Sequence, residues 1–134
     1  MRKVIVSLAL SGTLAGLTVA TGPVRSAEAQ AELDTDLMQA IEDSNKSLSS
    51  NISLKDAKAS ASDAREINQA FIQVEAYFAA RPDAHDAVEL AKKTRELTDQ
   101  IVQSVGSGNF DAAADSATAL SRTCRTCHTF YKKS

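Results

Sequence analysis

The sequence predicts an all-α protein built as an antiparallel up-down-up-down four-helix bundle. Four stretches of the chain place apolar residues three or four positions apart, which is the spacing of one face of a helix. Short segments containing Ser, Pro, Gly or Asn separate the stretches, and no stretch shows the alternation typical of a strand. Helices of similar length that are joined by short turns pack as antiparallel neighbours, which favours the bundle.

The first helix is predicted over residues 32–51. Asp34 and Asp36 lie near its start, where carboxylates interact favourably with the helix dipole. The segment 44–53 is rich in Ser and Asn, so we expect the helix to fray or end early there. The apolar stripe of this helix consists of Leu33, Leu37, Ile41, Leu48 and Ile52.

The second helix is predicted over residues 54–79. The segment from Ser53 to Asp56 resembles a capping box in which Asp replaces the usual Glu or Gln. The segment 81–83 ends the helix, and we expect Pro82 to be the first residue of the third helix. The stripe of the second helix contains Leu54, Ala57, Ala61, Ala64, Ile67, Phe71, Val74 and Phe78.

The third stripe runs from Ala84 to Val105, and the segment 106–108 contains two glycines that stop the helix. Asn109 is a suitable N-cap for the fourth helix. The inward stripe of the fourth helix is predicted to contain Phe110, Ala113, Ala117, Leu120, Cys124, Cys127 and Tyr131.

A five-residue motif near the C-terminus carries the chemistry of the chain: Cys124-Arg125-Thr126-Cys127-His128. Cys-x-x-Cys-His is the attachment signature of a c-type haem. The two thiols add to the two vinyl groups of the porphyrin, and the adjacent imidazole coordinates the iron. Residues three apart lie on one side of a helix, so both thiols can reach one edge of the ring. The motif predicts one covalent haem c, held by Cys124 and Cys127, with His128 as an axial ligand.

Two other kinds of site share the Cys-x-x-Cys spacing. A structural zinc site needs four ligands, whereas the chain has two cysteines and, apart from His128, one further histidine, His85. A thioredoxin-like dithiol lies near a strand–helix–strand pattern, and the sequence shows no convincing strand. Haem attachment is therefore the favoured interpretation.

The N-terminal segment 1–29 is predicted to be a cleaved secretory signal peptide. It has a charged start, an apolar run from Val4 to Ala20 and an Ala-Glu-Ala site at 27–29. The apolar run approaches the length of a membrane anchor, but its glycines and the Gly22-Pro23 pair favour removal. We expect residues 30–134 to form a haem-bearing bundle domain in the periplasm, without stable membrane insertion.

Charge restricts the partners of this domain. Loss of residues 1–29 removes three of 15 basic side chains and one of 17 acidic side chains, leaving 12 against 16 and a net charge of −4. Nucleic acid is therefore not an expected partner. Four basic residues follow the last acidic residue, Asp115, and either steer an acidic redox partner or stabilise the end of the helix: Arg122, Arg125, Lys132 and Lys133.

The core positions are small, since many are Ala and the chain has no Trp. A bundle of this kind buries little apolar area. A haem inserted between the helices would supply apolar bulk, while a close-packed Ala-rich bundle is the alternative.

A C-terminal attachment motif on the last of four helices resembles the class II cytochromes c, the cytochrome c prime family. The likeness covers residues 30–134 and depends on few specific residues, chiefly the segment 108–133 around the motif. Tyr131 matches the family pattern after the histidine, whereas Lys132 replaces its arginine and loses the planar guanidinium. In the family, dimers form through the first two helices, and Ala57, Ala59 and Ala61 permit a homodimer here.

The resemblance also concerns the sixth position of the iron. Some members leave it empty and bind small gases, and others coordinate a methionine from the first helix. The pair Leu37-Met38 stands where low-spin members place this ligand, although Asp34 occupies a place that is often basic in them. Thioether and imidazole form an established axial pair. Met38 as a filler of the core remains the alternative.

The remaining histidine and the basic cluster of the third helix are less favoured as parts of the haem site. His85 is predicted to be a solvated surface residue and is less favoured than Met38 as a ligand. Lys92, Lys93 and Arg95 are expected on an exposed face of the third helix.

The favoured function is a periplasmic electron carrier that cycles between Fe(III) and Fe(II), with His128 and Met38 as axial ligands. The alternatives are a five-coordinate haem protein that binds NO or CO and an electron-accepting subunit of a larger redox complex. No acid–base or nucleophile constellation appears outside the motif, so we do not expect the chain to be an enzyme.

Overall fold

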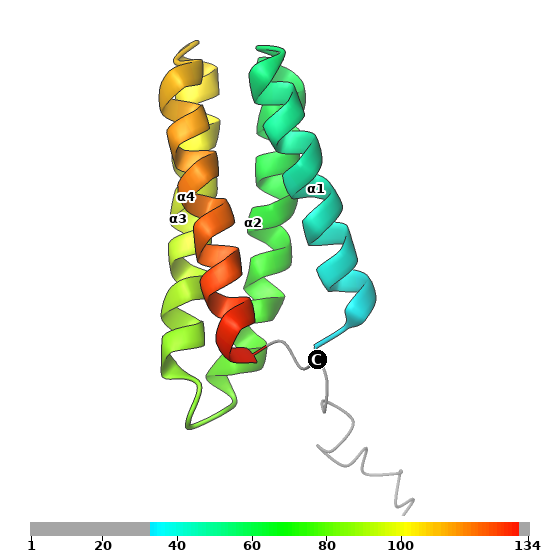
Figure 1. The fold of residues 1–134 in the computed structure, drawn as a ribbon, viewed down its shortest axis with the longest axis vertical. Helices are drawn as coiled ribbons and strands as arrows, with labels where there is room; N and C mark the ends of the chain where they lie inside the picture. The colour runs from blue at the N-terminus through cyan, green and yellow to red at the C-terminus, as the bar shows by residue number, and fades with distance from the viewer. Residues whose placement is uncertain (1–32, 132–134) are drawn as a thin grey trace, which may run out of the picture.

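The computed structural model describes residues 33–131, which form four α-helices and no strand (Figure 1). This confirms the all-α four-helix prediction. The predicted signal peptide and the residues Lys132 and Lys133 lie outside the described range. The helices are α1, Thr35–Ser53; α2, Ala57–Ala79; α3, His85–Gly106; and α4, Phe110–Tyr131.

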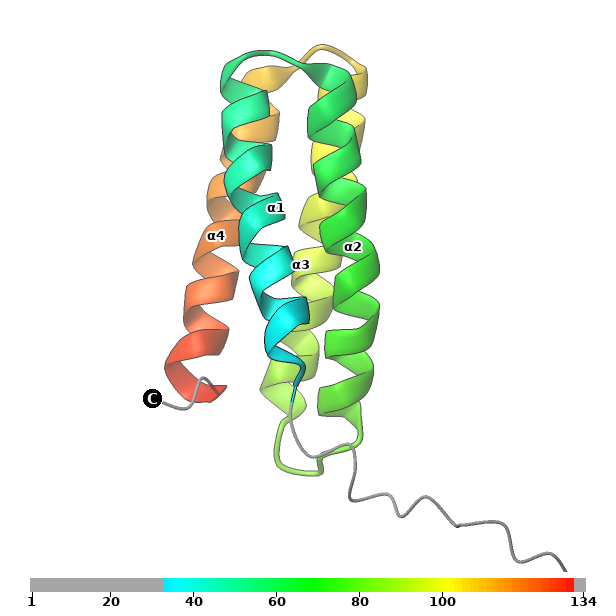
Figure 2. The same ribbon diagram turned by 90° about the vertical axis from the view of Figure 1, so that its right-hand side faces the viewer.

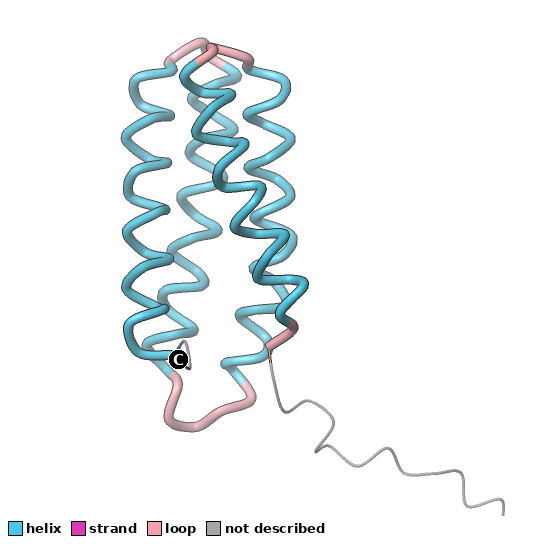
Figure 3. The backbone as a smooth tube through the Cα atoms, turned by 45° about the vertical axis from the view of Figure 1, so that its right-hand side comes forward, coloured by secondary structure: helices cyan, strands magenta, loops and turns pink. Residues whose placement is uncertain are grey.

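Consecutive helices are joined at alternating ends of the bundle (Figures 2 and 3). We call the end that holds the α2–α3 turn, the start of α1 and the end of α4 the motif end, and the opposite end the far end. Each helix contacts two neighbours in a ring, with the largest contact between α2 and α3 and the smallest between α1 and α4. In Figures 1 and 2 the ends of α1 and α4 lie further apart at the motif end than at the far end. None of the helices within residues 33–131 is long and apolar enough to cross a membrane.

The core is continuous along the bundle but differs between its ends. Large aliphatic side chains with almost no solvent contact lie from the middle to the far end: Leu48, Ile67, Ile101, Val105 and Leu120. At the motif end the buried positions of α3 are alanines, which pack opposite aromatic and Val residues of α2: Ala84, Ala87, Ala91, Phe71, Val74 and Phe78.

The α1–α2 turn differs from the prediction. The expected capping box at Ser53 is wrong, because Ser53 is the last residue of α1 and the N-cap of α2 is Asp56, whose carboxylate accepts from the Ala59 N–H at 2.9 Å. Lys55 adopts a left-handed φ of 56° between the two helices. Leu54 belongs to this turn and is 74% exposed, so it is not part of the α2 stripe.

The expected early end of α1 is also wrong. The Ser hydroxyls there donate to carbonyls of the preceding turn, from Ser49 to Asn45 at 3.0 Å and from Ser53 to Ser49 at 2.9 Å. Asn51 donates to the Asp63 carboxylate of α2 at 2.7 Å. The Ser and Asn side chains, which on their own favour loops, here form hydrogen bonds within α1 and to α2, and the helix continues to Ser53.

Pro82 is not the first residue of α3, which begins at His85. The chain instead makes two turns after α2, in which the Arg81 N–H donates to Phe78 and the Ala84 N–H donates to Arg81. Ala84 is buried at the start of α3, so packing and not a side-chain cap sets this helix end.

The α3–α4 turn agrees with the prediction. Gly108 has a φ of 75°, a conformation that glycine adopts without strain. The Asn109 side chain accepts from the Ala112 N–H at 3.1 Å and caps α4.

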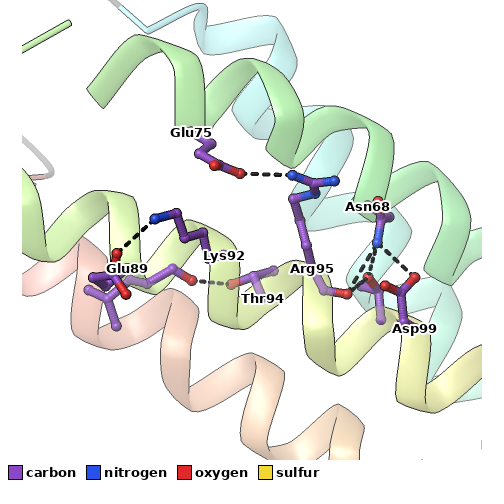
Figure 4. Close-up of polar contacts among 9 residues, drawn as sticks. Asn68, Glu75, Glu89, Lys92, Thr94, Arg95 and Asp99 are labelled. Atoms are coloured by element: carbon purple, nitrogen blue, oxygen red, sulfur yellow. Dashed lines mark hydrogen bonds and ion pairs between the residues drawn. The ribbon is translucent and has the colours of Figure 1, made fainter. Parts of the chain in front are cut away.

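A polar cluster joins α2 to α3 across their large contact (Figure 4). The Asn68 amide of α2 donates to the Arg95 carbonyl, the Thr98 hydroxyl and the Asp99 carboxylate at 3.1, 2.8 and 3.1 Å. Arg95 pairs with Glu75 of α2 at 2.8 Å and is half-buried. The prediction of an exposed face therefore holds for Lys92 and Lys93 but is wrong for Arg95, because Arg95 lies between the two helices.

Candidate functional site

The two cysteines lie on the inward face of α4, near the motif end. Both thiols are half-buried, unbridged and packed against the core. Burial, with a smaller effect from Cys127, raises the pKa of the Cys124 thiol to about 11. Burial and the nearby charge of Asp86 raise the pKa of the Cys127 thiol. Both thiols are thus protonated at neutral pH, side by side on one helical face and in apolar surroundings.

The last turn of α4 is held by contacts from α3 and from α2. The Tyr131 hydroxyl donates to the Asp86 carboxylate in the first turn of α3. The Tyr131 ring packs on Phe78 of α2, with centroids 4.9 Å apart. This hydrogen bond, with burial and the charge of Asp86, raises the pKa of Tyr131 to about 12. Asp86 was not identified from the sequence, because it is 45 residues away and no motif marks it.

The relative position of Met38 and His128 follows from one contact between α1 and α4. The Asn45 amide donates to the Ser121 hydroxyl at 3.3 Å, so these two residues face each other. Met38 precedes Asn45 by seven residues and His128 follows Ser121 by seven, which is close to two turns, or about 10.5 Å, in each helix. Both steps lead toward the motif end. Helix geometry therefore brings Met38 and His128 to about the same level, on the faces of α1 and α4 that continue from Asn45 and Ser121.

The side chains at this level are more exposed than those nearer the far end. Toward the far end, Leu48 on α1 and Leu120 on α4 are fully buried. Toward the motif end, Met38 and Cys124 are only half-buried, and His128 is exposed. Toward the motif end, the last buried residue of α1 is Ile41 and the last buried residue of α4 is Leu120. Beyond these positions the side chains of both helices are half-buried or exposed.

The other candidates lie elsewhere. His85 is exposed, as expected, and is the first residue of α3. Arg122 and Arg125 are exposed on α4, and Arg125 lies beside α1, where it lines a groove with Ser49 and Ile52. Within residues 33–131, no three His, Cys, Asp or Glu side chains come together in a way that would hold a metal ion.

The residues at the motif end fit a covalently attached haem c in their donor chemistry. Two neighbouring thiols and one imidazole lie on α4 and one thioether lies on α1; the thiols and the thioether are half-buried against the core, and the imidazole is exposed.

Comparisons of the chain with protein-family models, with curated proteins and with solved structures find no match.

Proposed function

We propose that this protein is a periplasmic electron-transfer protein with one covalently attached haem c. In this proposal Cys124 and Cys127 form the thioether bonds, and His128 and Met38 are the axial ligands. The bundle is the antiparallel up-down-up-down form of the class II cytochromes c, exported by means of a signal peptide. When bound, the haem supplies an iron that takes up and releases one electron.

The observation that carries the proposal is the register of α1 and α4. Two helical turns from the Asn45–Ser121 hydrogen bond, Met38 and His128 come to about one level of the bundle, where Met38 is half-buried and His128 is exposed. An apolar macrocycle at this level would complete the core, and its burial would contribute stability in proportion to the apolar area removed from water.

Each residue of the proposed haem site has surroundings that support its role. The thiols are held on one face by α4, and their apolar surroundings suit a porphyrin edge. The Tyr131–Asp86 hydrogen bond and the Tyr131–Phe78 contact fix the turn that carries His128. Met38, on the opposite helix, offers a soft thioether that favours the reduced iron.

Met38 also supports a second candidate function. It is half-buried and packed against the core, which is equally the behaviour of a methionine that fills a gap. In that case the sixth position is open, and the protein binds small gases such as NO or CO.

Covalent attachment is tested by expression in cells that mature c-type haem, followed by denaturing electrophoresis and a haem stain. We expect the stain to migrate with the polypeptide and to be lost in the Cys124→Ser/Cys127→Ser variant. His85→Ala, which changes a histidine outside the motif, is the matched control and keeps the stain. A wild-type polypeptide without covalent haem would contradict the proposal.

A further inference from the structure

A groove lies beside the attachment motif, between the last turns of α4 and the start of α3. Its volume is about 770 Å³. Phe130 and Thr126 form its α4 side, and Pro82 and Leu90 contribute apolar surface from the α2–α3 turn and from α3. Phe130 is 67% exposed, and large apolar side chains that remain exposed beside a groove are typical of interaction sites.

The charge at this groove is negative. Three carboxylates line it, from Asp83, Asp86 and Glu89, and none of its lining residues is a Lys or Arg. Glu89 is paired with Lys92 at 2.9 Å, and Asp86 accepts the Tyr131 hydroxyl. Asp83 has no ion-pair partner within the described residues. Within residues 33–131, the groove therefore has more negative than positive charge around an apolar centre.

The groove is adjacent to the attachment site. Thr126 lines it, the next residue is Cys127, and Asp86 is near enough to Cys127 to raise the pKa of its thiol. The basic residue Arg125 lies on another side of α4, where it lines a separate groove of about 310 Å³ with Ser49 and Ile52 of α1. The two sides of α4 next to the motif thus carry opposite charge.

We propose that the groove around Phe130 is the docking surface for a redox partner that presents an apolar side chain surrounded by lysines or arginines. This inference rests on the proposed electron-transfer function. Phe130 supplies the apolar anchor, as aromatic residues do at the centres of interfaces, and the carboxylates steer and align the basic partner. A partner docked here lies within one residue of a thioether bond to the haem.

The test uses the haem-loaded protein and a short peptide in which lysines flank a single leucine, with a glutamate version of the same peptide for comparison. Binding is followed by NMR shifts of backbone amides. We expect the lysine peptide to shift amides around Thr126, Phe130 and Leu90, and the shifts to weaken as salt is added.

Two variants test the apolar anchor and the carboxylates of the groove separately. Phe130→Ala is expected to weaken binding by about tenfold, the loss typical of an interface anchor. Asp83→Asn/Glu89→Gln should weaken binding several-fold and remove most of the salt dependence. Lys58→Gln, at an exposed position in the first turn of α2 at the far end, is the matched control and should leave binding unchanged.

Three results would overturn the proposal. They are preferential binding of the glutamate peptide, shifts centred on Arg125 and not on Phe130, or a Phe130-dependent self-association that makes the groove an interface between two copies. The haem stain is measured on the same samples, so a failure of haem attachment is distinguished from a failure of docking.

Discussion

Tyr131 joins the end of α4 to two other helices, since its hydroxyl binds Asp86 of α3 and its ring packs on Phe78 of α2. The unfolded chain releases the phenol proton near pH 10, whereas the folded chain holds it to about pH 12, the raised pKa of Tyr131. Between these values the unfolded state binds fewer protons than the folded state, so stability must fall as pH rises. Below pH 10 the Tyr131–Asp86 hydrogen bond makes its full contribution to the stability of the fold.

Tyr131→Phe removes this contribution and keeps the aromatic ring. We expect the variant to melt at a lower temperature than the wild type at pH 8, with the difference shrinking as pH rises from 10 to 12. Circular dichroism melting curves over this pH range provide the measurement. Tyr77→Phe is the control, because the Tyr77 hydroxyl forms no hydrogen bond in the described structure. A melting difference that does not shrink between pH 10 and 12 would contradict the raised pKa of Tyr131 in the folded chain.

At the scale of the helices, the α2–α3 pair has the most extensive packing in the bundle. It has the largest contact, and one Asn68 amide serves three acceptors on α3 (Figure 4). Removing this half-buried amide loses its hydrogen bonds, each of which contributes about 0.5–1.5 kcal/mol. The Thr98 hydroxyl still donates to the Arg95 carbonyl at 2.6 Å, and Asp99 is exposed to water.

Asn68→Ala is expected to lower the free energy of unfolding by about 1–3 kcal/mol. Urea titration monitored by circular dichroism measures this loss. Gln69→Ala, at the neighbouring exposed position of α2, should change stability by less than about 0.5 kcal/mol. Equal effects of the two substitutions would contradict the role given to the Asn68 cluster.

The helices could be predicted from the sequence, but their ends could be predicted only in part. Apolar periodicity identified all four, and Asn109 and the glycines before it marked a true turn. The errors at Ser53 and Pro82 have one physical cause: local patterns for a cap or a first turn competed with packing, and packing decided. Leu54 is exposed and Ala84 is buried, and no local sequence pattern predicts either result.

At the scale of the whole molecule, the site depends on how α1 and α4 are aligned. The motif could be read directly from the sequence, and its placement on an inward helical face is confirmed for Cys124 and Cys127. The Asn45–Ser121 contact, which aligns Met38 with His128, joins residues 76 positions apart and has no local signature. Asp86 and the groove at Phe130 were missed for the same reason.

The division of the core between its two ends is also a property of the whole bundle. α2 and α3 have buried residues along their length, whereas toward the motif end the last buried residue of α1 is Ile41 and that of α4 is Leu120. A bundle built in this way is expected to need a further apolar group between α1 and α4, which is the role proposed for the haem.

The visible absorption of the purified haem-loaded protein, oxidised and reduced, with and without carbon monoxide, tests the proposed His128–Met38 ligation most directly. We predict a low-spin spectrum that carbon monoxide does not change, and a high-spin spectrum that responds to carbon monoxide in Met38→Ala. Gln39→Ala, at the adjacent exposed position of α1, should behave as the wild type. A wild-type spectrum that is already high-spin and shifts with carbon monoxide would contradict Met38 ligation and favour the gas-binding function.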